Sequence, residues 1–200
     1  YILNGSVINN LYKTSLNNKV KKIIFIAQAT FGPERLDQEI KIFEKIIKLS
    51  SELNLPLFYL LKTKNNHFVT KKIKDYFKER ILKKDFFLIE RDEDTYSHLR
   101  SNAIFFTNSS TLGFEAISRK KKVIFLPLSN FPVKNYLKRY PRNGPFWTND
   151  HSYLNIKNMT KKILKINQNK WTTIVKKNIL EIINFKPRNP ELIKLLRKYN

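Results

Sequence analysis

The stretch that decides the fold is residues 107–127, TNSSTLGFEAISRKKKVIFLP. It follows one apolar run, Ala103 to Phe106, and ends in another, Val123 to Leu126. Short continuous apolar runs of this kind are typical of buried parallel strands. Between them, a hydroxyl-rich turn opens a short helix. The N-terminus of such a helix points unpaired N–H groups and the positive end of its dipole out of the sheet's carboxyl edge, so we expect an anion site there.

The turn itself supplies the candidate contacts for a diphosphate. Hydroxyl residues are common helix N-caps, so one of Ser109, Ser110 and Thr111 is expected to cap. The other hydroxyls are then available to phosphate oxygens. We expect Gly113 to let the ligand approach the backbone closely. The stretch has neither the Gly-Lys-Ser/Thr of nucleotide triphosphatases nor the spaced glycines of dinucleotide enzymes, so those two classes are unsupported.

Glu115 is the candidate for the ribose. A capping box would need Ser or Thr three positions earlier, and position 112 is Leu, so the box is absent. Two interpretations stay open from the residues alone. One is a carboxylate in the first helical turn, which would stabilise the helix by about 0.3–1 kcal/mol. The other is an acceptor for both ribose hydroxyls of a nucleotide.

The rest of the chain predicts an α/β fold, a Rossmann-like three-layer domain with a mainly parallel sheet. Further strands are expected at 22–27, 57–61 and 86–89, alternating with helices, of which the second is expected to be capped by Thr70. Residues 1–19 are interpreted as a linker or edge segment, and residues 20–157 as the Rossmann-like domain. Residues 158–200 should form closing helices, at 159–166, 171–183 and 190–198.

Three other groups of residues compete for roles at this edge. Thr30 follows the first strand and is a second candidate for phosphate contact. Asp92, Glu93 and Asp94 could hold Mg²⁺ or Mn²⁺, but a helix N-cap with an acidic first turn explains them better, so no metal site is predicted. Phe146 and Trp147 either pack against the sheet or offer a stacking platform to a sugar or acceptor.

The amino-acid composition limits which classes of partner the protein is expected to bind. Lys and Arg exceed Asp and Glu by 23 charges, which would ordinarily suggest nucleic acid or an anionic membrane. The lysines are scattered among many Asn and Ile, as a compositional bias would produce, so no specific nucleic-acid partner is expected. The tetrad Arg119 to Lys122 also suits a helix C-terminus. No signal peptide or membrane span is recognised, and Cys is absent, so a cytoplasmic location is predicted, with weak attraction to the inner membrane face as an option.

Several of these strings together carry a resemblance. STLGFEA after FFTN, then KKVIFLP, GPFWTND, a Trp-bearing helix and FKPRNPELIKLL resemble the carboxyl half of surface-carbohydrate biosynthesis transferases of the O-antigen or capsule type. These are related to the two-domain GT-B glycosyltransferases. The similarity covers most of the chain and is strongest from Phe86 to Asp150.

The resemblance implies a donor-binding half of a GT-B architecture that takes a UDP- or CMP-type nucleotide sugar and needs no further cofactor. In similar enzymes the Ser/Thr-Gly turn holds the diphosphate, the Glu matched by Glu115 accepts the ribose hydroxyls, and the segment matching Glu90 and Arg91 lies near the base. The general base often comes from the amino-terminal domain, which we expect to lie upstream of this chain, so no catalytic residue is nominated. A glycan acceptor is the second expected partner.

Two alternatives follow. An enzyme of the same fold could be a nucleotide-sugar epimerase or a polyol-phosphate transferase. A protein of another class would be a non-catalytic basic domain that binds nucleic acid or an anionic membrane surface, with an affinity that falls steeply with salt.

Overall fold

The structure is a computed structural model that describes residues 19–27, 33–61, 67–89, 97–128 and 143–179, together with Lys194 and Arg197. The order of elements is β1 (Lys22–Ile26), α2 (Pro33–Leu53), β2 (Leu57–Leu60), α3 (His67–Tyr76), α4 (Lys78–Leu82), β3 (Phe87–Ile89), the 3₁₀ helix η1 (Ser97–Arg100), β4 (Ala103–Thr107), α5 (Thr111–Ser118), β5 (Lys122–Phe125), α6 (Tyr153–Lys165) and α7 (Gln168–Ile179).

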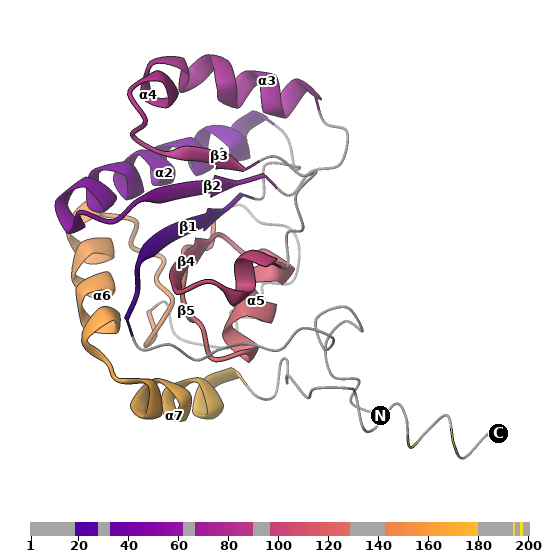
Figure 1. Ribbon diagram of the computed structural model, residues 1–200, viewed down its shortest axis with the longest axis vertical. Helices are drawn as coiled ribbons and strands as arrows, with labels where there is room; N and C mark the ends of the chain where they lie inside the picture. The colour runs from indigo at the N-terminus through magenta and orange to yellow at the C-terminus, as the bar shows by residue number, and fades with distance from the viewer. Residues whose placement is uncertain are drawn as a thin grey trace.

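The five strands form one parallel sheet in the order β3-β2-β1-β4-β5 (Figure 1). The order reverses between β1 and β4, where Ile26 is paired in register with Thr107. The chain therefore leaves these two strands side by side at the carboxyl edge, which is where open α/β sheets bind ligands. The predicted α/β, Rossmann-like, parallel fold is confirmed.

Helices cover both faces of the sheet, so β4 and β5 are buried at every position, whereas the edge strand β3 is partly exposed. Along a strand, side chains alternate between faces, and Phe25 therefore faces away from Ile26 and its neighbour Thr107. On the Phe25 face, the ring of Phe43 from α2 packs against Phe25 and Tyr59 at centroid distances of 5.2 and 4.5 Å. On the other face, Phe114 of α5 packs against Phe125 at 4.7 Å. This two-sided burial explains why the strands are continuous apolar runs.

The closing helices are anchored to the amino end of β5. Lys122 donates through Nζ to the carbonyls of Leu164 and Ile166, at 3.0 and 2.8 Å, and so caps the end of α6. The indole of Trp171, which is fully buried, donates to the carbonyl of Lys121 at 3.0 Å. Helix α6 begins at Tyr153, so the predicted division between residues 157 and 158 falls inside a continuous helix.

Other predicted boundaries differ from the structure in detail. Thr70 lies inside α3, which begins at His67, so the prediction that it caps this helix is wrong. Tetrad residue Lys120 has a φ of 62°, and Lys121 donates its N–H to the carbonyl of Ala116 at 3.1 Å. This is the Schellman geometry that ends a helix, with Lys where Gly is usual. The predicted 190–198 helix lies outside the described ranges.

Candidate functional site

The site begins where β4 ends. Thr107 Oγ1 accepts the N–H of Ser110 at 3.2 Å, and Ser110 Oγ accepts the N–H of Leu112 at 3.3 Å. Ser110 is therefore the N-cap of α5, as its extended φ and ψ of −64° and 137° also indicate. The prediction that one of the three hydroxyl residues caps the helix is confirmed, and the residue is Ser110.

The remaining hydroxyls differ in exposure. Ser110 is buried at 1% exposure, Ser109 is half-buried and Thr111 is exposed. Thr111 is the first residue of α5, so its side chain stands at the positive end of the helix dipole. Ser109 and Thr111 therefore lie closer to solvent at the helix start than the buried N-cap Ser110 does.

Gly113 is required for packing. A Cβ added there would lie 2.5 Å from Thr107 Cγ2 and 3.3 Å from Phe125 Cε1, and the Gly113 N–H donates to the Ser110 carbonyl at 2.9 Å. This contact with the strand behind α5 explains the glycine by packing, and the expectation that it also lets a ligand approach the backbone stays a prediction. Gly113 contributes to the site by letting the helix start sit against β4 and β5.

Glu115 is buried at 7% exposure and is the fifth residue of α5. With the N-cap at Ser110, the first turn of α5 contains no acidic residue. The alternative that Glu115 is a first-turn carboxylate is therefore wrong. Positions 111 and 115 are four apart, so Thr111 and Glu115 share a face of the helix. A ligand that meets the helix start could extend along this face to the carboxylate.

Phe146 and Trp147 lie in the core, at 0% and 3% exposure. The Phe146 ring contacts the rings of Trp147 and Trp171 at centroid distances of 5.0 and 5.8 Å. A Cβ on Gly144 would lie 2.0 Å from the Trp147 ring, so the glycine of this motif makes room for the indole. The structure thus corrects the sugar or acceptor role of the two aromatics, because neither ring offers a face for stacking.

The other predicted site residues lie outside the described residues: Thr30, Glu90, Arg91 and the acidic trio Asp92 to Asp94. What the fold does place is the start of the Thr30 loop, since Ala27 follows β1 directly beside the end of β4. Within the described part of the chain, no cluster of three or more His, Cys, Asp or Glu could hold a metal ion.

Sequence reasoning missed a buried polar network beside the turn. Tyr59 donates its hydroxyl to Glu39 Oε1 at 2.8 Å, and Asn108 donates Nδ2 to Glu39 Oε2 at 2.7 Å. Glu39 stands three residues after Leu36 and four before Phe43, on the apolar face of α2. A carboxylate at a core position of an amphipathic pattern was the available signal.

The basic tetrad is also more buried than its composition suggests. Lys121 and Lys122 are each 6% exposed, and Lys121 Nζ contacts the carbonyls of Arg100 and Ser101 at 3.4 and 3.3 Å. Burial, followed by the neighbouring charge of Arg119, lowers the pKa of Lys121 to about 8. These lysines belong to the amino edge of the sheet, opposite the turn, so they anchor β5 and do not form part of the candidate site.

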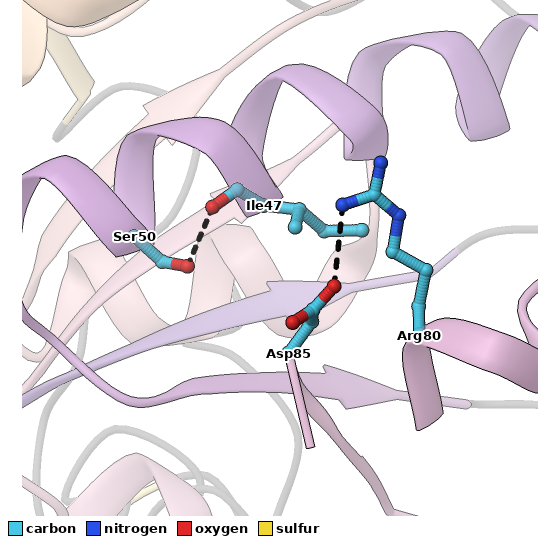
Figure 2. A network of polar contacts seen from close by, with 4 residues as sticks. All are labelled: Ile47, Ser50, Arg80 and Asp85. Carbon is cyan, nitrogen blue, oxygen red and sulfur yellow. Dashed lines mark hydrogen bonds and ion pairs between the residues drawn. The ribbon is translucent and has the colours of Figure 1, made fainter. Parts of the chain in front are cut away.

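A hollow of about 750 Å³ lies at that same amino edge, between the end of α2 and the turn that leads into β3. Two of its polar side chains pair with each other, and a third bonds to the backbone. Arg80 pairs with Asp85 at 3.2 Å, and Ser50 donates to the carbonyl of Ile47 at 2.8 Å (Figure 2). Because parallel sheets bind ligands at the carboxyl edge, we place the candidate site at the α5 start and not in this hollow.

A protein-family profile described as "putative O-antigen biosynthesis protein" matches residues 42–200. The chain belongs to this family. The match covers the candidate turn, α5 and the closing helices, and it confirms the resemblance to surface-carbohydrate biosynthesis proteins. A comparison with curated proteins finds no match.

Solved structures show the same fold at low identity. A UDP-GlcNAc 2-epimerase from Neisseria meningitidis, bound to UDP-GlcNAc, is 16% identical with a TM-score of 0.51, over 92% of this chain and 46% of that one. The Methanocaldococcus jannaschii UDP-GlcNAc 2-epimerase, in complex with UDP-GlcNAc and UDP, is 15% identical with a TM-score of 0.54, over 91% and 46%. An O-GlcNAc transferase mutant from Thermobaculum terrenum is 10% identical with a TM-score of 0.53, over 96% and 37%.

The chain thus spans less than half the length of these structures. Their fold is that of GT-B glycosyltransferases and related epimerases, and this chain shares it. Among the described helices, none combines the length and the apolar character that crossing a membrane requires.

Proposed function

We propose that this chain is the donor-binding part of a glycosyltransferase that uses a nucleotide-activated sugar in surface-polysaccharide biosynthesis. The observation that carries the proposal is the placement of Thr111 and Glu115 on one face of α5, whose start lies where the strand order reverses. Family membership supports the polysaccharide context, and the nucleotides bound by the two epimerase structures support the ligand class.

The chemistry assigned to this chain is electrostatic. In sugar transfer, the bond between the sugar and the diphosphate breaks, and negative charge develops on the leaving phosphate. The dipole of α5 and the hydroxyls of Ser109 and Thr111 face that charge and stabilise it more in the transition state than in the ground state. Glu115 accepts the ribose hydroxyls and fixes the nucleotide along the helix. The general base and the acceptor site are assigned to an amino-terminal domain, and the reaction to the cytoplasmic side of the membrane.

Calorimetric titration of the 200-residue chain with UDP, CMP and CDP tests the donor site. We expect saturable binding of one nucleotide and a loss of about tenfold or more in Glu115→Ala, because a buried carboxylate that accepts two hydroxyls contributes on the order of 1.4 kcal/mol or more. Glu52→Ala is the matched control, because it also removes a carboxylate from a helix. Glu52 of α2 pairs with Lys157 of α6 at 2.6 Å, away from the start of α5. Salt-sensitive binding to heparin or DNA, with none to any nucleotide, would contradict the proposal.

A nucleotide-sugar epimerase is the second candidate, favoured by the two epimerases that share the fold over more than 90% of this chain. The full-length protein distinguishes the two activities. An epimerase converts UDP-GlcNAc to its C2 epimer without an acceptor, which NMR of the sugar detects. A transferase leaves the donor's C2 configuration unchanged and releases the nucleotide in step with glycan extension.

A further inference from the structure

Glu39, Tyr59 and Asn108 form a polar network that joins three elements inside the protein. Glu39 comes from the second turn of α2, Tyr59 from β2, and Asn108 from the first position after β4. Their exposures are 1%, 0% and 0%. The two hydrogen bonds to the carboxylate, 2.8 Å from the Tyr59 hydroxyl and 2.7 Å from Asn108 Nδ2, bridge 20 and 69 residues of sequence.

A buried carboxylate at a core position costs free energy, because the charged group loses its contact with water. Replacing Glu39 together with its hydrogen-bond partners by apolar residues of similar shape would avoid the desolvation of the charge, and such joint replacements are often neutral or stabilising. Tyr59 remains a hydroxyl donor, because burial, and then the charge of Glu39, raises its pKa well above 10. The stability of the sheet alone therefore does not account for a glutamate at position 39.

Asn108 gives the network a direct connection to the candidate site. The ladder between β1 and β4 ends at Thr107, the residue that directly precedes Asn108. Asn108 is the next residue, and its amide orientation is set because only its NH₂ group can donate to the carboxylate. Ser109 and the N-cap Ser110 follow at once.

We propose that Glu39 is a positioning residue for nucleotide binding: through Asn108 it holds the turn at residues 109–111 in the orientation that meets the donor diphosphate. The inference rests on the proposed function of that turn. Helix α2 supplies no candidate ligand contact among its described residues. Its role in this inference is to set the geometry of the turn from the opposite face of the sheet.

The chemistry of the side chains provides the test variants. Glu39→Met keeps the volume but leaves Asn108 Nδ2 without this acceptor. Glu39→Gln can still accept from Asn108 through its carbonyl oxygen, while its NH₂ donates to the Tyr59 hydroxyl, which can accept. Tyr59→Phe removes the other hydrogen bond and leaves the one to Asn108 in place.

We expect Glu39→Met to weaken UDP or CMP binding about tenfold, the order of effect of depriving a buried donor of its acceptor. Glu39→Gln should keep the affinity within about threefold of wild type. Tyr59→Phe should keep it within about twofold of wild type, even if its melting temperature falls as far as that of Glu39→Met. In an Asn108→Ala background, Glu39→Met should add less than about twofold, since the path through Asn108 is already cut.

Equal loss of affinity in Glu39→Met and Tyr59→Phe, in proportion to their losses of melting temperature, would show a merely structural role and overturn the inference, as would unchanged affinity in folded Glu39→Met. Should Glu39→Met not fold, Asn108→Ala, which retains the bond between Tyr59 and Glu39, takes its place with the same expected loss and the same refutation.

Hydrogen exchange separates this inference from the proposed function. If wild type binds no nucleotide, the proposed function fails, and the amides of residues 109–112 in the free protein decide the positioning role. Exchange that is about tenfold faster in Glu39→Met but unchanged in Tyr59→Phe supports it. Equal exchange in the two variants overturns it.

Discussion

Gly113→Ala tests whether the start of α5 is held against the sheet by the absence of one methyl group. The added Cβ would lie 2.5 Å from Thr107 Cγ2, whereas carbon atoms pack best at about 3.5–4.0 Å, so the helix start or the strand must move by about 1 Å. Overpacking of this kind costs about 1–3 kcal/mol, offset by about 0.5–1 kcal/mol because alanine favours the helix.

The middle values of these ranges leave a net loss of about 1 kcal/mol, which for a protein of this size lowers the melting temperature by roughly 2–4 °C. Urea unfolding followed by circular dichroism measures it. Nucleotide affinity should fall as well, because Thr107 Oγ1, on the same side chain as the clashing methyl, accepts the N–H of the N-cap residue.

Thr107→Ser supplies the matched partner, since it removes Cγ2 and keeps the hydroxyl that accepts from Ser110. In the double variant, Gly113→Ala should cost less than half of what it costs alone, and the double-mutant cycle gives the coupling directly. If Gly113→Ala is as stable as wild type, or if its cost is the same with Ser at position 107, the close approach does not restrain the helix and the reasoning fails.

Three further predictions concern the same stretch and its surroundings. Ser110→Ala should lose about 1 kcal/mol of stability together with nucleotide affinity, whereas Ser152→Ala, which removes the N-cap of α6, should lose a similar stability and leave affinity unchanged; urea unfolding and calorimetry compare them. Lys120→Gly should stabilise the protein by about 1 kcal/mol in thermal unfolding, because the residue has a φ of 62°, and an unchanged or lower melting temperature would contradict this. The pKa of Lys121 is lowered to about 8 in the folded protein from 10.5, so the unfolded chain binds more protons between these values and stability should rise with pH from about 8 to 10.5; Lys121→Met should show a smaller rise than wild type over that range.

The sheet was predictable because its strands are buried on both faces. A strand such as Ala103–Thr107 is buried at every position because helices cover both sides, and its first four residues therefore form an uninterrupted apolar run in the sequence. The helix after it was predictable from its hydroxyl cap. Periodicity could not show which residue types are required by contacts between distant parts of the chain. Position 113 must be glycine because Thr107 and Phe125 lie against it, and position 144 because the indole of Trp147 does.

The site was predicted less completely, for a related reason. Ser110 carries a local signal, because a cap acts on residues two positions away. Asn108 carries none, and the carboxylate of Glu39 at a core position of α2 does not indicate its partner, because their contact joins residues 69 positions apart and exists only once α2 lies on the sheet. Glu115 shows the same limit: its place in α5 depends on where the helix begins, and a shift of the N-cap by a few residues decides whether the carboxylate belongs to the first turn.

The strand order also has a consequence for how the protein is made. Lys22 of β1 pairs with Ala103 of β4, so one edge of the central strand waits for a partner that is synthesised about 80 residues later. At roughly 5–20 residues per second, that interval lasts on the order of 4–16 s. During this interval β1, β2 and β3 can assemble, while the edge of β1 that later pairs with β4 stays unpaired. We expect the nascent chain to depend most on chaperones in that state.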